Sequence, residues 1–553
     1  MFEAVDPLSY GTLAASLART VASYGERPAL VVPPMAKRAY HPGGIEFTWA
    51  HTAAAAAEWQ ARYAAAGYGP GHRIAILFDQ RPEFVFHHFA LNALGCSVVP
   101  INADYRSDEI AFVLDHSEAC LALAIGERLD DMRAAVRELP RAIPVLHFDD
   151  RSEALPSPPI ATGNAVIDGT TEAVLLYTSG TTGRPKGCVM TNEYFHTFGS
   201  WLLTRGGRLA MKMGMERLYN PLPLHHANCL SISLPAMLLS GGCLVFPDRF
   251  HASSFWDDIV SCRITAIQFQ GVIPNILMKL SERAREREHE VKFALCAGIE
   301  PTLHAGFERR FGFPLVEMWA MSETGRFMCD HVEPRQIHTR AIGRSVPGCE
   351  ARAVDDHDND VADGAQGEFV VRNSAETPRK GFFSGYFNNE AATEEAWRGG
   401  WFRTGDVVVR DESGMFYFAD RKKNIIRRSG ENIAAAEVEA CLVAHEAVAQ
   451  AAVIAVPDDL REEEVMACVV PSGTIEAGEA LARELSAWCC ARMSYFKAPG
   501  WFLFVDRLPT GSSQKFVKIK MFPEGVDPRE EHGAVDLRAL KKPALAQAVR
   551  AER

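Results

Sequence analysis

Long hydrophobic runs are missing from this sequence of 553 residues. No uninterrupted apolar stretch approaches the ~18 residues that a membrane-spanning helix needs, so we expect no membrane span. The N-terminus carries Glu3 and Asp6 where a secretory signal has basic residues followed by an apolar stretch, so we expect no signal peptide either. A cytoplasmic protein is the resulting expectation.

Paired cysteine motifs and surplus positive charge are also missing. The 13 cysteines are scattered singly except for the neighbours Cys489 and Cys490, and no Cys/His spacing suggests a zinc site. Reduced cysteines fit a cytoplasmic location. The net charge of −12 argues against nucleic acid as the main partner, because phosphate backbones bind to basic faces. A local positive site for a small polyphosphate is still compatible with that charge.

The length exceeds what one hydrophobic core supports, so at least two domains are expected. Up to about residue 420, short apolar runs alternate with helical patterns, which is typical of α/β units with largely parallel sheets. This alternation predicts a helix at 82–94 and strands at 73–78, 97–101, 173–177 and 242–246. The mixed-charge run 281–290 (SERAREREHE) is expected to be a solvated helix face.

The pattern changes near Asp420. Before it, strands at 407–410 and 415–418 are joined by the turn DESG. After it come the basic run RKKNIIRR, a helix from about Ala434 and a strand at 451–456. We therefore predict a large domain at 1–420, a hinge at 421–424, a small α+β domain at 425–525 and a loosely attached polar tail at 526–553.

The most informative stretch is AVLLYTSGTTGRPKGCVM, from Ala173 to Met190. Glycines let backbone N–H groups approach an anion, hydroxyls add donors and Lys186 adds charge, which together predict a triphosphate cradle. It is not a P-loop, because Gly187 follows Lys186 where Ser or Thr is required, and a strand follows instead of a helix. The other predicted ligands of the phosphates are Thr178, Ser179, Gly180, Thr181, Thr182 and Gly183.

The segment TSGTTGRPKG closely resembles the phosphate loop of the adenylate-forming superfamily, which includes acyl- and aryl-CoA synthetases, firefly luciferases and peptide-synthetase adenylation domains. The resemblance extends from about residue 10 to 525, and the pattern is nearest to crotonobetaine/carnitine-type ligases. It implies a large N-terminal domain of stacked α/β sheet subdomains and a small, mobile α+β C-terminal domain. It also implies ATP and Mg²⁺ as cofactors.

The segment WAMSE, from Trp319 to Glu323, resembles the family segment next to adenine. The resemblance implies that Trp319 stacks near adenine beside Ala320, that Ser322 donates to phosphate and that Glu323 binds Mg²⁺. Taken alone, the pentapeptide would be a helix start with Ser322 as its cap. The segment GIEP similarly implies that Gly298, Ile299 and Glu300 pass adenine and the acyl carboxylate.

Asp406 and Arg421 lie on the predicted hairpin. A turn centred between Glu412 and Ser413 places Asp406 opposite Ala419 and close to Arg421. The resemblance implies that Asp406 binds the ribose hydroxyls and that Arg421 assists. A surface ion pair is the alternative, worth at most about 1 kcal/mol.

Two C-terminal segments complete the resemblance. Ser429, Gly430 and Glu431 match the loop that lines the channel for the pantetheine arm of CoA. Lys515 in LPTGSSQKFVK matches the lysine that holds the carboxylate and the α-phosphate oxygens during adenylation, with Gln514 in place of the usual glycine. The thiol must then replace Lys515, which implies rotation of the small domain about Lys423.

The resemblance thus implies an ATP-dependent acid:CoA ligase in which Lys515, Glu323 and Lys186 are catalytic. The acid is not identified by the sequence. His226 matches a residue beside the acyl site, Arg326 could meet a polar group, and Trp201 and Phe269 could line an apolar pocket, which we weight slightly higher. A stand-alone enzyme that loads a separate acyl carrier protein and a non-catalytic adenylate-binding relative remain alternatives. A homodimer is compatible with the sequence.

Overall fold

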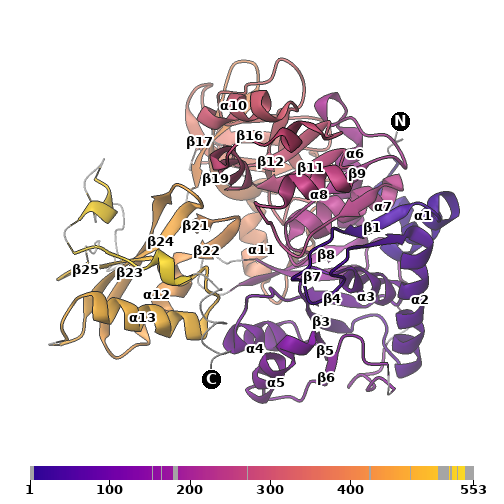
Figure 1. Ribbon diagram of the computed structural model, residues 1–553, viewed down its shortest axis with the longest axis horizontal. Helices are drawn as coiled ribbons and strands as arrows, with labels where there is room; N and C mark the ends of the chain where they lie inside the picture. Colours follow the sequence, from indigo (N-terminus) through magenta and orange to yellow (C-terminus); the bar gives the residue numbers. More distant parts are fainter. Residues whose placement is uncertain are drawn as a thin grey trace. The chain divides into compact units, whose positions relative to one another are not determined.

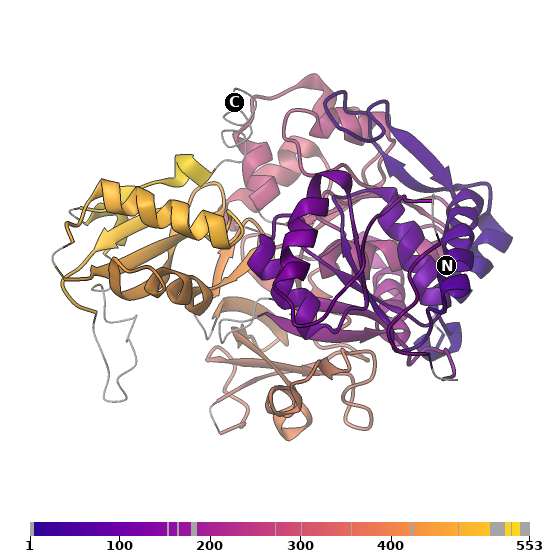
Figure 2. The same ribbon diagram turned by 90° about the horizontal axis from the view of Figure 1, so that it is seen from below.

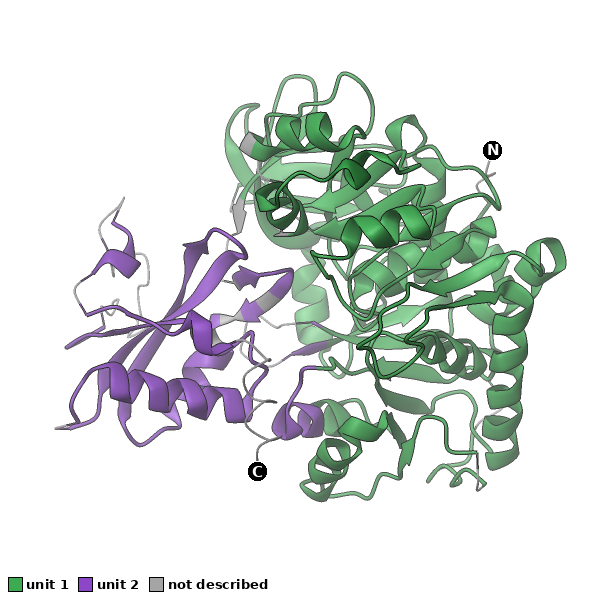
Figure 3. Cartoon of the chain, in the orientation of Figure 1, with its two compact units in different colours: residues 1–103, 113–177, 187–422 green, residues 104–112, 178–186, 423–553 purple. Residues whose placement is uncertain are grey.

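The structure of the protein is a computed structural model. It describes residues 5–151, 154–162, 165–178, 185–270, 272–299, 301–355, 357–421, 425–473, 475–508, 522, 526–531 and 533–541. The chain forms two compact units, which Figure 3 colours separately. Unit 1 comprises residues 1–103, 113–177 and 187–422, and unit 2 comprises 104–112, 178–186 and 423–553. The hinge at 421–424 stays a prediction.

The first sheet of unit 1 has eight strands in the order β14-β13-β12-β11-β9-β10-β1-β2. Its central strands pair in parallel, whereas β14 and β2 are antiparallel edge strands. The strands are β1 (Pro28–Val32), β2 (Ile45–Thr48), β9 (Arg217–Tyr219), β10 (Cys243–Val245), β11 (Ala266–Gln270), β12 (Phe293–Ala297), β13 (Leu315–Ala320) and β14 (Phe327–Cys329).

The second sheet has seven strands in the order β18-β8-β7-β4-β3-β5-β6. Its strands are β3 (Arg73–Leu77), β4 (Ser97–Pro100), β5 (Leu121–Ala124), β6 (Val145–His147), β7 (Glu172–Thr178), β8 (Lys186–Thr191) and β18 (Gly385–Tyr386). Strands β3, β4, β5, β6 and β7 pair in parallel. The strands expected at 73–78, 97–101, 173–177 and 242–246 are all present within one residue of their predicted ends.

The helices of unit 1 cover these sheets (Figure 1). One hydrophobic core contains side chains of both large sheets together with α1, α2, α3, α6 and α7, and a second core on the eight-stranded sheet contains α8, α9 and α10. The helices are α1 (Leu13–Tyr24), α2 (Trp49–Ala66), α3 (Pro82–Ala93), α5 (Leu129–Arg137), α6 (Asn192–Thr204), α7 (Leu234–Ser240), α8 (Phe255–Ser261), α9 (Val272–Lys279), α10 (Pro301–Phe311) and α11 (Glu390–Ala396). A further helix, α4 (Ser107–His116), begins in residues of unit 2 and ends in residues of unit 1.

A third sheet of unit 1 has five strands in the order β15-β20-β19-β17-β16, seen in salmon in Figure 2. The strands are β15 (Ala341–Arg344), β16 (Glu350–Val354), β17 (Gln366–Arg372), β19 (Phe402–Arg410) and β20 (Met415–Arg421). The expected hairpin is present, but its register was predicted wrongly. Asp406 pairs directly with Arg421 instead of Ala419, because the register shifts between Val407 and Val408.

Unit 2 is built on a six-stranded sheet in the order β22-β21-β24-β25-β26, with β23 also paired to β24. Helices α12 (Ala435–Val443) and α13 (Glu479–Arg492) contribute to its core. The strands are β21 (Ile425–Arg428), β22 (Glu431–Ala434), β23 (Val448–Asp458), β24 (Glu462–Pro471), β25 (Trp501–Phe504) and β26 (Val535–Asp536). The fold class, α/β with a small α+β unit, is confirmed.

Two local predictions were wrong. The run 281–290 contains a single 3₁₀ turn, Ala284–Arg287, instead of a helix, because its charges make tertiary ion pairs such as Glu286 with Arg310. The segment from 533 to 541 is not a loose tail, since β26 pairs with β25 and Leu537 is buried. Among the described residues, no helix combines the length and the apolar character needed to cross a membrane.

Candidate active site

Trp319 and Asp406 come from different sheets of unit 1 and meet in a buried hydrogen bond. The indole Nε1 of Trp319, at the end of β13, donates to Oδ2 of Asp406 on β19 at 2.7 Å. The ring of Trp319 also packs edge-on against Phe369, with centroids 4.7 Å apart. The two side chains are only 5% and 4% exposed. A charge-assisted bond in such surroundings fixes the carboxylate of Asp406 firmly.

The carboxylate of Glu323 is the second one in this site that is held in place by hydrogen bonds. The hydroxyl of Tyr386, on the short strand β18, donates to Oε1 of Glu323 at 2.9 Å, and Phe383 N–H donates to the Glu323 carbonyl at 2.9 Å. Burial and the neighbouring Glu323 raise the pKa of Tyr386 well above its usual range, so the phenol stays a donor. Ser322 is tied down as well, since its carbonyl accepts from the Tyr194 hydroxyl at 2.7 Å.

Glu317 holds the start of the GIEP segment. Its two carboxylate oxygens accept from the backbone N–H groups of Gly298 at 2.9 Å and Ile299 at 2.8 Å. Gly298 has a φ of 80°, which glycine adopts without strain. Glu317 and Trp319 are two residues apart on β13, so they share one face of that strand. The structure thereby brings Gly298 and Ile299 to the strand that carries Trp319.

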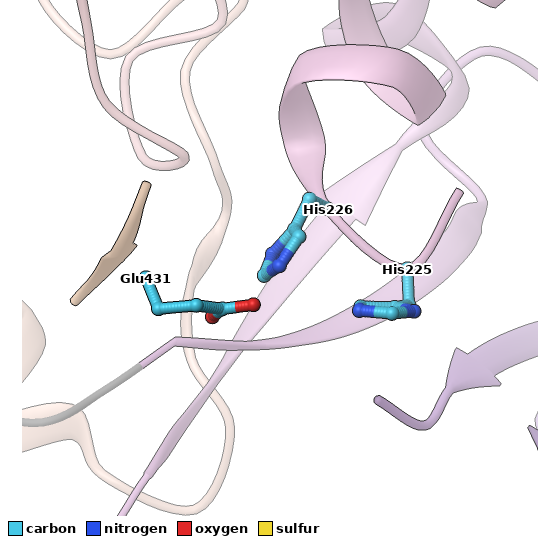
Figure 4. Close-up of side chains that lie close together, drawn as sticks. All are labelled: His225, His226 and Glu431. Atoms are coloured by element: carbon cyan, nitrogen blue, oxygen red, sulfur yellow. The ribbon is translucent and has the colours of Figure 1, made fainter. Parts of the chain in front are cut away.

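His225 and His226 lie side by side just before a π-helical turn, Asn228–Ser233 (Figure 4). Their rings are 4.6 Å apart and tilted by 56°. Burial, followed by the neighbouring His226, lowers the pKa of His225 well below its usual value, so this imidazole is neutral at pH 7. Single π-helical turns are frequent at functional sites. Glu431, also drawn in Figure 4, belongs to unit 2.

The other residues expected at the acyl pocket, Trp201, Phe269 and Arg326, lie in different surroundings. Phe269 lies in the second core among α8, α9 and α10, whereas Trp201 lies in the first core and donates to the Phe327 carbonyl. Arg326 is 1% exposed and donates to the carbonyl oxygens of Gly348 and Lys380 and to Asn373 Oδ1. An acyl pocket that includes both aromatic residues stays a prediction, and sequence spacing alone does not show which core a side chain enters. Arg326 connects three loops.

The remaining predicted residues are placed only in part. Thr178 ends β7, Lys186 begins β8 and Ala320 ends β13. Ser429 and Gly430 form the turn between β21 and β22, with φ angles of 51° and 85°, and Glu431 begins β22. Outside the described residues lie Ser179, Gly180, Thr181, Thr182, Gly183, Glu300, Lys423 and Lys515.

Sequence reasoning missed three residues that organise this site. Tyr386 contacts Glu323 from 63 positions away and Tyr194 contacts Ser322 from 128 positions away, so neither has a local signal. Glu317, in contrast, did have a local signal in the sequence. It is an acidic residue two positions before Trp319 in a strand that is otherwise apolar, and such a residue needs a partner when buried.

Comparison with known proteins identifies the family of the chain. Residues 17–387 match the family of AMP-binding enzymes, and residues 437–515 match the AMP-binding enzyme C-terminal domain. The sulfoacetate–CoA ligase of Cupriavidus necator is 31% identical over 93% of this chain and 98% of its own. A crotonobetaine/carnitine–CoA ligase of Escherichia coli is 29% identical over 82% of this chain and 88% of its own.

Solved structures give the same assignment. A mutant o-succinylbenzoate CoA synthetase from Bacillus subtilis, bound to a product analogue, has a TM-score of 0.77 at 25% identity. The match covers 91% of this chain and 97% of that one. The chain belongs to the AMP-binding enzymes. It is an AMP-forming acid:CoA ligase, with Mg²⁺ as cofactor and ATP and CoA as co-substrates, as the sequence predicted.

Proposed function

We propose that adenylation occurs on the face of unit 1 that carries Trp319, Glu323 and Asp406. The observation that carries this assignment is the 2.7 Å hydrogen bond from Trp319 to Asp406. A carboxylate accepts several hydrogen bonds, so Asp406 is proposed to accept from the two ribose hydroxyls, with the indole of Trp319 beside adenine. Asp406 is then a recognition group for the nucleoside, with no proton to transfer.

Glu323 is the proposed Mg²⁺ ligand. Carboxylate oxygen is the donor that Mg²⁺ prefers, and the carboxylate keeps acceptor capacity besides the bond that it accepts from Tyr386. Such a partner orients a metal ligand and tunes the site. When bound, Mg²⁺ neutralises charge on the phosphates. Tyr386 is a positioning residue, because it acts through Glu323.

The reaction needs two charged anions brought together, since a carboxylate oxygen attacks the α-phosphate and pyrophosphate leaves. Lys186 and Lys515 are proposed to offset that charge, Lys186 at the departing pyrophosphate and Lys515 at the reacting oxygens. In the second half-reaction the thiol attacks the acyl carbon and AMP leaves. The Ser429–Gly430 turn is proposed to line the thiol's path after rotation about Lys423.

For the acid, we propose a short carboxylic acid with a second charged or strongly polar group. Two things support this choice. The relatives named above act on sulfoacetate and on crotonobetaine or carnitine, and each of these acids carries a second charged group. The aromatic residues first considered for an apolar pocket lie in separate cores.

The enzyme is proposed to be cytoplasmic. A homodimer is the candidate for its oligomeric state, which light scattering measures.

One experiment tests the proposal directly. ATP–pyrophosphate exchange is measured with sulfonated, quaternary-ammonium, dicarboxylic, aromatic and long-chain acids at matched concentration. We expect exchange with a charged short acid to exceed that with aromatic and long-chain acids. Preference for an aromatic acid would overturn the substrate class. Thioester yield with CoA and with a phosphopantetheinylated carrier protein is then compared at equal thiol concentration, because a carrier-loading enzyme would prefer the carrier.

A further inference from the structure

The C-terminal segment 533–541 is an integral part of unit 2. Strand β26 pairs with β25 through Trp501↔Asp536 and Phe502↔Val535. Leu537 is 2% exposed, and its N–H donates to the Gly500 carbonyl at 2.8 Å. These contacts lead the chain through a short 3₁₀ turn, Arg538–Lys541, into the interior of the unit.

At the end of that turn, Lys541 enters a buried ion cluster with Glu464 and Arg428. Lys541 Nζ lies 2.5 Å from Glu464 Oε1, and Arg428 Nε donates to both oxygens of Glu464 at 2.8 and 2.9 Å. The three side chains are 0%, 0% and 2% exposed, respectively. Burial and the charge of Arg428 lower the pKa of Lys541 to about 7, and the neutral amine still donates to the carboxylate.

The geometry of this cluster depends on Lys541. An arginine normally meets a carboxylate through two nitrogens in a fork. Here one nitrogen, Nε, contacts both oxygens, and Arg428 Nη2 is buried without a hydrogen-bond partner in the described part of the chain. Oε1 of Glu464 has two further donors, the amine of Lys541 and the backbone N–H of Val465 at 2.8 Å, and Arg461 Nη1 lies 3.7 Å from Oε2. Loss of the amine removes one of these donors from Oε1, which leaves the carboxylate less constrained toward Arg428.

Gly500 adds a second constraint on the same carboxylate. A Cβ atom at this position would lie 2.7 Å from Cδ and 2.8 Å from Cγ of Glu464. Only glycine leaves the room that Glu464 occupies, so the side chain is confined from two sides. Gly500 also accepts the backbone bond from Leu537, so the same residue anchors the C-terminal segment.

Arg428 directly precedes the turn that is proposed to line the thiol's path. Ser429 and Gly430 both have positive φ angles, which is the two-residue hairpin turn of type I′. The Ser429 N–H donates to the Arg461 carbonyl at 3.0 Å, and Arg428 pairs with Glu462 on β24. The hairpin is therefore attached to the start of β24 next to its turn, and the side chain of Arg428 is bound to Glu464 on the same strand.

We propose that the segment 533–541 is a positioning element for thiol transfer, in which Lys541 fixes Glu464, Glu464 fixes Arg428, and Arg428 sets the Ser429–Gly430 turn. The inference rests on the proposed role of that turn. Lys541 touches no substrate, and its effect passes through two side chains. The expected consequence is a defect confined to the second half-reaction.

The test uses the full-length enzyme with Lys541→Met, Lys541→Gln and the control Arg529→Met. Arg529 lies in the same region and pairs with Asp527, so its loss removes one charge without touching Glu464. Two quantities are measured: amide hydrogen exchange of residues 425–434, and the rate of each half-reaction. For Lys541→Met we expect faster exchange in the hairpin, thiol transfer slowed by about tenfold or more, and adenylation within about twofold of wild type.

Each outcome decides a different step. Lys541→Gln keeps a donor for Glu464, so recovery of slow hairpin exchange in this variant supports the link from Lys541 to the turn. Wild-type behaviour of Arg529→Met supports the same link. Unchanged hairpin exchange in Lys541→Met overturns the link from Lys541 to the turn. Faster exchange with both half-reactions intact overturns the role of the turn in thiol transfer instead. Should Lys541→Met fold poorly, Gly500→Ala provides the same two readouts, since a Cβ at this position displaces Glu464.

Discussion

Trp319 donates its only side-chain N–H to the carboxylate of Asp406, and both groups are almost fully buried in unit 1. A phenylalanine keeps the ring and removes the donor. For Trp319→Phe we therefore expect the KM for ATP to rise by about tenfold, since a hydrogen bond to a charged group contributes about 1.5–3 kcal/mol. Steady-state kinetics with varied ATP measure this. An unchanged KM for ATP in both Trp319→Phe and Asp406→Ala would contradict the placement of the nucleoside.

Tyr386→Phe tests the orientation of the proposed metal ligand. The substitution removes the hydroxyl that holds Glu323 Oε1 and leaves the ring in place. We expect the Mg²⁺ concentration at half-maximal adenylation to rise by about 10–100-fold, with recovery at high Mg²⁺. Glu323→Ala should not recover at any Mg²⁺ concentration. Identical Mg²⁺ curves for wild type and Tyr386→Phe would argue against metal binding at Glu323.

Lys515→Ala separates the two half-reactions. Lys515 is proposed to act only on the oxygens that react during adenylation, so its loss should slow that step by about 10²–10³-fold or more. Thioester formation from a supplied acyl-adenylate should persist. Rapid-quench measurement of each half-reaction checks this. Equal losses in the two steps would contradict rotation of the small domain.

Substitution of Gly430 should affect thiol transfer alone. Gly430→Val places a branched side chain in the proposed path of the pantetheine arm and at a φ of 85°, which costs about 1–2 kcal/mol of backbone strain. Gly430→Asn tolerates that φ and serves as the control for strain. Slower thiol transfer in both variants indicates obstruction, and a defect in Gly430→Val alone indicates strain. Loss of adenylation in either variant would count against the assignment.

His88 makes unit 1 sensitive to acid. Burial lowers its pKa to about 4, whereas the unfolded imidazole has its ordinary value of 6.5. The unfolded chain binds more protons between these values, so the free energy of unfolding falls as the pH drops from 6.5 to 4. Neither ring nitrogen of His88 has a hydrogen-bond partner among the described residues. We expect His88→Leu to stabilise the protein by about 1 kcal/mol at pH 7 and to weaken the acid dependence.

Thermal unfolding from pH 4.5 to 7.5 measures this effect. His87 is the matched comparison, because it lies next to His88 on α3 but bonds to the Tyr63 hydroxyl and the Phe148 carbonyl. His87→Leu should destabilise the protein, since two polar groups lose their partner. A lower melting temperature for His88→Leu at pH 7 would contradict the prediction.

Local patterns in the sequence were enough for the class of protein and for most of its strands. The phosphate-loop segment, WAMSE and the Asp406 hairpin each occupy a short stretch, in which residue type and spacing carry the chemistry. The alternation of apolar runs likewise predicted the strands from 73 to 246, because burial in a parallel sheet leaves a continuous apolar run.

Long-range contacts were decided only by the tertiary structure. The bond from Tyr386 to Glu323 spans 63 positions and the pair of Lys541 with Glu464 spans 77, and neither separation follows a helical or strand period. Trp201 and Phe269 are apolar residues in apolar segments, and only the packing of the helices assigns them to different cores. Asp406 pairs with Arg421 instead of Ala419 because the hairpin contains a register shift, and no turn residue in the sequence indicates that shift. Side-chain pairing across a fold depends on how elements pack, and spacing along the chain does not contain that information.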